Sequence, residues 1–119
     1  MTEDLELREF VATRLMGWAA RNTASELGRM FERAGSYPTP LRLLPAYETD
    51  WAAMGLVIEA MRAKGYVIGH VRWDNLYLDP KWAKYGKYLW HASFAEGDAY
   101  ADSAPLAVAR AARAAMEAM

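Results

Sequence analysis

A run of lysines and aromatic residues is the part of the sequence best suited to contact a nucleic acid. Residues 81–88 read Lys-Trp-Ala-Lys-Tyr-Gly-Lys-Tyr. Lysines can neutralise phosphates, and aromatic rings can stack on nucleobases. The candidate nucleic-acid-binding residues are Lys81, Trp82, Lys84, Tyr85 and Lys87. The alternative is a solvated loop in which lysine stems cover aromatic rings that fold back onto the protein.

A second candidate site precedes the clearest helical pattern in the chain. It consists of Tyr47, Thr49, Asp50 and Trp51. Backbone N–H groups at the start of a helix can hold an anion, so a small anionic ligand such as a nucleotide is one hypothesis. The alternative is structural, because Thr49 can cap the helix while the two aromatic side chains pack together as a staple.

The two histidines of the chain, His70 and His91, both fall in segments with strand patterns. If those strands are neighbours, the imidazoles share a face of the sheet, and with Asp79 they could bind zinc. Two histidines without a fixed-spacing motif are weak evidence for such a site. Hydrogen-bonded structural histidines are the commoner case, so the sequence alone predicts no metal site.

Three carboxylates near the C-terminus, Glu96, Asp98 and Asp102, surround a glycine and could hold a hard cation. Their spacing does not match the EF-hand loop. Capping of the final helix by Asp102 or Ser103 accounts for the same residues. We also find no Ser-His-Asp, Walker or dinucleotide-binding pattern. We therefore expect no catalytic residues and no cofactor.

The overall composition narrows the function classes further. The formal net charge is −1, which lacks the strongly basic character of many nucleic-acid binders. With 54% hydrophobic residues the chain can form a packed core, and without cysteine it has no disulfides. No apolar run approaches the roughly 20 residues that span a membrane. The acidic N-terminus is unlike a signal peptide, so we expect a cytoplasmic protein.

Periodicity predicts helices in the first half of the chain. An amphipathic helix is expected over 2–20, and a capping-box pattern predicts a second one over 24–34, ended by Gly35. Three prolines make 36–47 a connector. A third helix is expected over 50–64. It closes at Lys64 and Gly65.

The second half alternates in the manner of strands. We expect strands over 66–73, 76–79 and 88–94, a loop over 95–102, and a final helix over 103–118. Short turns favour an antiparallel meander, and strands that are apolar on both sides favour helices on both faces of the sheet. Trp51 and Trp90 are expected to be buried.

These elements predict one α+β domain over 1–119. It comprises an N-terminal helical segment (1–35), the Pro-rich connector (36–47) and an α-β-β-β-α core (48–119). The predicted order is α-α-α-β-β-β-α, with a small three-stranded antiparallel sheet in an α/β/α sandwich. Double-stranded RNA-binding domains share the α-β-β-β-α order, but here acidic residues rather than lysines precede the last helix.

Three stretches carry a family resemblance: RLMGW at 14–18, LPAYETDWAAMGLVIEAMRAKGY at 44–66 and ADSAPLAVARAARAAM at 101–116. Together they resemble the phage ABA sandwich domain, an α/β/α layer found in phages and prophages. The resemblance implies a phage or prophage accessory gene. It assigns no catalytic residues to this chain, because the family has none that could be transferred.

The leading hypothesis from the sequence is a non-enzymatic module that binds a host or phage protein, for example to counter host defence. Its aromatic content suits this, since aromatic residues are enriched at the energetic centres of interfaces. Nucleic-acid binding through 81–88 and capture of a small anion near 47–51 are the alternatives. No membrane partner is expected. The sequence leaves the oligomeric state open and is compatible with a homodimer.

Overall fold

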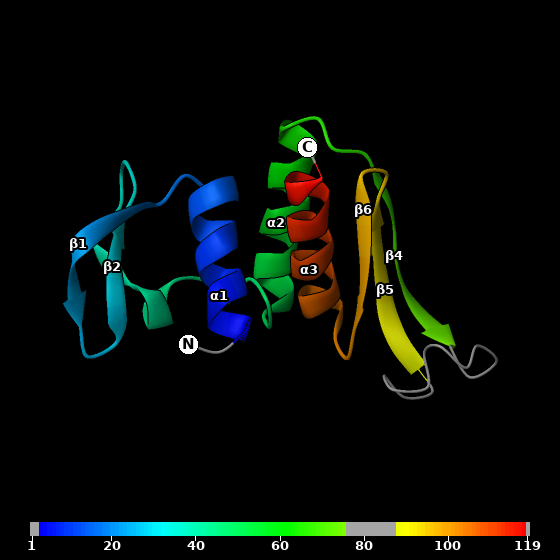
Figure 1. Cartoon of the computed structure of the whole chain (residues 1–119), viewed down its shortest axis with the longest axis horizontal. Coiled ribbons are helices and arrows are strands. Elements are labelled where there is room, and N and C mark those ends of the chain that lie inside the picture. The colour runs from blue at the N-terminus through cyan, green and yellow to red at the C-terminus, as the bar shows by residue number, and fades with distance from the viewer. Residues whose placement is uncertain (1–2, 76–87, 119) are drawn as a thin grey trace.

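The computed structural model describes residues 3–75 and 88–118 and shows a mixed α+β protein. The described part contains three α-helices and two three-stranded antiparallel sheets. Figure 1 shows the first sheet at one end of the molecule, the helices in the middle and the second sheet at the other end. None of the described helices is long and apolar enough to cross a lipid bilayer.

The first helix is shorter than expected. Helix α1 (Glu3–Phe10) continues as a π-helical turn, η1 (Val11–Leu15), and ends there rather than at residue 20. The reason is Gly17, whose φ of 82° lies in the left-handed region that stops a helix. The chain then enters a strand.

The helix expected over 24–34 is wrong, because these residues form most of a β-hairpin. Strand β1 (Ala19–Ser25) pairs antiparallel with β2 (Gly28–Glu32), which in turn pairs with the short β3 (Thr39–Pro40). Gly28 has a φ of 110°, which excludes it from a helix. A Cβ there would lie 3.2 Å from the Leu41 Cβ, so the glycine also permits close contact with the following segment.

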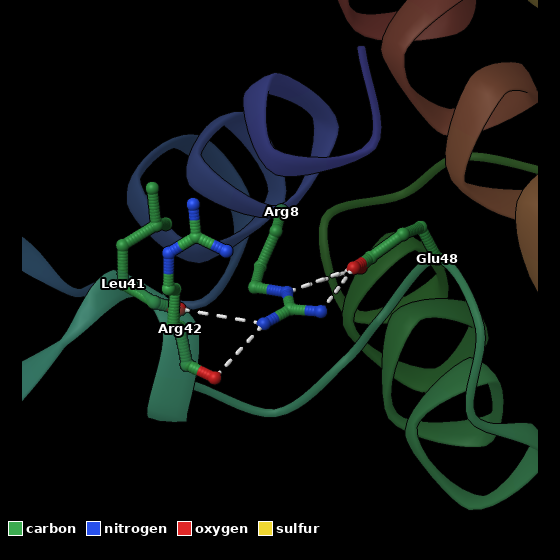
Figure 2. Close-up of polar contacts among 4 residues, drawn as sticks. All are labelled: Arg8, Leu41, Arg42 and Glu48. Carbon is green, nitrogen blue, oxygen red and sulfur yellow. Dashed lines mark hydrogen bonds and ion pairs between the residues drawn. The ribbon is translucent and has the colours of Figure 1, made fainter. Parts of the chain in front are cut away.

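Arg8 of α1 contacts the connector over 36–47 and also forms an ion pair with Glu48, the residue that follows it (Figure 2). The connector contains β3 and a single 3₁₀ turn, η2 (Leu41–Leu43). The Arg8 Nε donates to Glu48 Oε1 over 2.8 Å, and an Arg8 Nη1 hydrogen bond reaches the Arg42 carbonyl over 3.2 Å. The Glu48 side chain is 1% exposed. Arg8 therefore ties α1 to both ends of the segment 41–48.

The second sheet has the order β4-β5-β6, with all pairs antiparallel. Its strands are β4 (Ile68–Asn75), β5 (Tyr88–Phe94) and β6 (Gly97–Ala101). The third strand is a correction, since 97–101 was expected to be part of a loop. The strand expected over 76–79 lies outside the described residues.

Helix α3 (Ala104–Glu117) covers one face of this sheet. Its N-cap is Ser103, whose Oγ accepts from the Leu106 N–H, and most of its packing residues are small. The buried residues of α3 are Ala104, Pro105, Ala107, Val108, Ala109, Ala111, Ala112 and Ala115. Small side chains let the helix approach the sheet closely. A Cβ on Gly97 would lie only 2.6 Å from the Ala115 nitrogen.

All the described helices lie on the same side of this sheet in Figure 1, so the expected coverage of both faces and the α/β/α sandwich are not confirmed. Helix α2 (Trp51–Ala63) begins and ends close to the predicted positions. Its N-cap is Asp50 rather than Thr49, because the Asp50 carboxylate accepts from the Ala52 N–H.

The two tryptophans expected in the core differ in their exposure. The prediction for Trp51 is wrong, since 56% of this residue is exposed. Trp90 is partly buried and packs against the edge of the core. The Trp51 ring makes a T-shaped contact with the Trp90 ring, with centroids 5.4 Å apart.

Candidate functional site

The second sheet separates two side-chain clusters that lie on its opposite faces. Trp73 of β4 is paired with Trp90 of β5, so these two side chains point to the same face. His91 follows Trp90 in the strand and points to the other face, where its cross-strand partner on β6 is Tyr100. Both clusters depend on the register of these strands.

The tryptophan cluster consists of Trp51, Trp73 and Trp90. The Trp90 ring makes a T-shaped contact with each of the others, with ring centroids 5.4 Å from Trp51 and 5.5 Å from Trp73. Edge-to-face geometry at this distance is favourable for aromatic rings. Trp51 is 56% exposed and Trp73 54% exposed. The cluster therefore joins the start of α2 to the sheet and leaves two large aromatic side chains in contact with solvent.

The histidine cluster consists of His70, His91, Asp98 and Tyr100, contributed by all three strands of the sheet. His70 Nε2 lies 2.7 Å from His91 Nδ1, and His91 Nε2 lies 2.8 Å from Asp98 Oδ2. Tyr100 stacks on the His91 ring at 4.2 Å with an interplanar angle of 10°. His91 is 8% exposed, so these contacts hold an almost buried imidazole.

With a neutral His91 imidazole, one arrangement of protons satisfies both of its hydrogen bonds. The Asp98 carboxylate only accepts hydrogen bonds when ionised, so His91 Nε2 must carry its proton. In the neutral imidazole the other nitrogen, Nδ1, then has a lone pair and accepts from His70 Nε2–H. The three side chains form a line of acceptor and donor groups that ends in a carboxylate.

The four residues proposed to hold a small anion do not share one environment. Tyr47 is buried at 1% exposure, whereas Thr49, Asp50 and Trp51 are exposed. Burial raises the pKa of the Tyr47 phenol above its ordinary value of 10.0, and the positive charge of Arg33 opposes part of that rise. The Asp50 carboxylate accepts from one backbone N–H at the start of α2, which an anion would otherwise use.

The carboxylates considered for a hard cation serve different purposes. Glu96 Oε1 accepts from the Val67 N–H over 3.1 Å, and Asp98 bonds to His91. In the described ranges 3–75 and 88–118, no three metal-ligating side chains gather around one point. The predicted nucleic-acid-binding residues 81–87 and the proposed zinc ligand Asp79 lie outside the described residues.

The fold has a counterpart among solved structures. A phage protein from Bacillus cereus ATCC 14579 is similar with a TM-score of 0.60, and the match covers 98% of this chain and 90% of that one. The sequences are 18% identical. At this identity the likeness is one of fold. No family model matches the chain, and no curated protein matches its sequence. Membership of the ABA sandwich family therefore stays a prediction.

Sequence reasoning identified parts of both clusters but not their partners. It paired the histidines through neighbouring strands, yet named Asp79 rather than Asp98, because the sequence pattern predicts a loop over 97–101. It singled out Trp51 for its place at the helix start and did not connect it to Trp73. The hairpin of 88–94 and 97–101 places Asp98 beside His91, and no periodic pattern in the sequence indicates that pairing.

Proposed function

We propose that the chain is a phage or prophage accessory protein that binds a host or phage protein through the tryptophan cluster and catalyses no reaction. The observation that carries the proposal is the exposure of Trp51 and Trp73 around the half-buried Trp90. Tryptophan is among the residues most enriched at binding hot spots. Covering two exposed indoles with a partner removes a large apolar area from water.

The proposed origin has two sources of support. One is the fold similarity to a phage protein from Bacillus cereus, and the other is the resemblance of 14–18, 44–66 and 101–116 to a phage domain. A phage or prophage product would meet its partner in the cytoplasm of a bacterial host. A component of host defence is then a suitable target.

Nucleic-acid binding is the second candidate, and the position of the cluster in the chain favours it over anion capture. Trp73 and Trp90 flank, in sequence, the basic-aromatic stretch 81–88. Base stacking on exposed indoles and phosphate contacts from lysines would use adjacent parts of the chain. Such binding would weaken steeply with salt.

The test is an affinity pull-down from phage-infected host lysate, run with and without nuclease. The wild-type protein is compared with a Trp51→Ala/Trp73→Ala double variant. The matched control is Leu43→Ala, which removes an apolar side chain that is 62% exposed and lies in η2. We expect a stoichiometric partner that survives nuclease and is retained by the control.

The expected loss in the double variant is large. Each hot-spot residue contributes at least about 2 kcal/mol, or roughly 30-fold in Kd. A melting curve close to the wild type shows that the double variant is folded. Retention of the partner by the double variant would refute the proposed surface. Recovery that vanishes with nuclease would replace it with the nucleic-acid hypothesis, and reproducible turnover on a substrate panel would refute the absence of catalysis.

A further inference from the structure

The histidine cluster brings together the two strongest transition-metal ligands that this chain offers. The sequence contains two histidines and no cysteine. The histidines are 21 residues apart, yet their ring nitrogens lie 2.7 Å from each other across β4 and β5. Imidazole nitrogen is the commonest protein ligand for zinc and related ions after thiolate is excluded.

From this arrangement we infer a transition-metal site, suited to Zn²⁺, in which His70 Nε2 and His91 Nδ1 are the ligands and Asp98 positions His91. The site lies on the opposite face of the sheet from the tryptophan cluster, so the inference does not depend on the proposed function.

The separation of the two nitrogens is close to what a metal requires. Two imidazoles bound to one tetrahedral zinc place their nitrogens about 3.3 Å apart, given Zn–N distances of about 2.0–2.1 Å. The observed 2.7 Å must widen by about 0.6 Å, and both rings must turn so that their lone pairs converge on the metal. His70 is partly exposed, so an ion can reach the pair from solvent even though His91 is nearly buried.

Asp98 supplies the outer contact that metal-binding histidines usually have. Ligating imidazoles almost always donate their second N–H to a carboxylate, a carbonyl or water, which fixes the tautomer and the ring orientation. Asp98 accepts from His91 Nε2 over 2.8 Å and so directs the Nδ1 lone pair toward His70. Tyr100, stacked flat on His91, restrains the ring further.

Metal binding replaces the hydrogen bond between the two rings. The proton on His70 Nε2 leaves to solvent and Nδ1 takes one up, so His70 stays neutral and Nε2 gains a lone pair. In the described part of the chain no third metal-ligating side chain converges with the two imidazoles, so these residues supply two ligands. Such a site binds more weakly than a structural zinc site with four protein ligands.

The first experiment is calorimetric titration of the untagged protein with ZnCl₂, repeated on His70→Gln, His91→Gln and Asp98→Asn. We expect one zinc per chain, with at least a tenfold loss of affinity in either histidine variant. Loss of an outer-shell partner typically costs 10–100-fold, which is the range expected for Asp98→Asn. The matched control is Asp102→Asn. Asp102 is an exposed carboxylate close to Asp98 in the sequence, and this variant should bind zinc like the wild type.

Long-range ¹H–¹⁵N spectra of the imidazoles test the inference even if a variant fails to fold. The two histidines give two sets of ring signals. The metal-free protein should show His91 protonated at Nε2, and Zn²⁺ should shift the His91 Nδ1 and His70 Nε2 resonances. Unmoved ring nitrogens at saturating Zn²⁺, or equal affinity in wild type and His91→Gln, would make the pair a structural hydrogen bond and overturn the inference.

Discussion

Among the described residues the two sheets have the same number of strands and the same antiparallel pairing, but they are stabilised in different ways. Every residue of β1 is exposed, and Phe31 is the one buried residue in β1, β2 and β3, all of which the structure describes. The second sheet instead lies against the alanine-rich face of α3, with Ala92, Phe94 and Ala101 buried beneath it.

This difference shows that strand pairing alone does not define a stable sheet in a small protein. An isolated hairpin is marginal in water, and a covering helix or a buried side chain must stabilise it. The first sheet has one aromatic anchor and the second has a continuous close-packed interface. We expect the first to open locally far more often.

The largest effect expected is on the first sheet. Phe31→Ala removes its one buried side chain, which is 0% exposed, and should lower the free energy of unfolding by about 3–5 kcal/mol. Urea denaturation measures the loss. Hydrogen exchange should show amides of 19–32 losing protection while β5 keeps it. Leu27→Ala, at the exposed hairpin turn, is the control and should change stability by less than about 0.5 kcal/mol. Equal loss of protection in both sheets would show that they unfold as one unit.

The ion pair of Arg8 and Glu48 should come next. Glu48→Ala leaves the Arg8 guanidinium largely buried without its carboxylate, which costs about 3 kcal/mol. Glu3→Ala breaks the more exposed pair with Arg110 and should cost no more than about 1 kcal/mol. Thermal melts at matched ionic strength compare the two. If both variants melt alike, Arg8 does not fasten the segment 41–48 as described.

Gly97 tests the interface of the second sheet. Gly97→Ala would place a Cβ 2.6 Å from the Ala115 nitrogen and 2.9 Å from the Ala114 carbonyl carbon, so backbone must move. Overpacking of this kind costs about 1–3 kcal/mol. Gly55→Ala is a control with the opposite sign, because nothing lies within 4 Å of its Cβ position and alanine favours the helix by about 0.5–1 kcal/mol. Stabilisation by both substitutions would contradict the close contact between β6 and α3.

The elements that the sequence predicted well are those whose local signals agree with their tertiary environment. Helix α2 and helix α3 combine apolar periodicity with caps, and β5 alternates cleanly, with Trp90, Ala92 and Phe94 on the inward side. Residues 24–34 carry a conflict instead. Their capping-box pattern suits a helix, but Gly28 at positive φ and the burial of Phe31 against the body favour a hairpin.

The candidate sites were harder to predict than the fold because they depend on register. Asp98 reaches His91 only because β6 pairs with β5 through a short turn, and seven residues of separation do not reveal that pairing. Trp73 meets Trp90 across strands joined by 76–87, a connection whose length does not specify which residues pair. Neither contact leaves a periodic trace in the sequence.

The smallest expected effect is the pH dependence of stability that comes from the buried Tyr47. The positive charge of Arg33, the residue after β2, lowers the pKa of Tyr47, but burial raises it more. Because burial raises the pKa of Tyr47, the unfolded chain ionises first as the pH rises above about 10. The unfolded state then binds fewer protons than the native state, so stability falls with pH by up to about 1.4 kcal/mol per unit until Tyr47 itself ionises. Below pH 10 the contribution of this group is fully present.

Tyr47→Phe removes this linkage while keeping the ring. Urea denaturation of both proteins between pH 8 and 11 should give a constant difference below pH 10 and a steeper alkaline loss in the wild type. Taking the difference cancels the six other tyrosines of the seven in the chain. Parallel curves across the whole range would mean that the Tyr47 hydroxyl reaches water in the native state. The surroundings of Tyr47 would then open as readily as the first sheet. Tyr47 would belong to the loosely held part of the molecule rather than to the packed body.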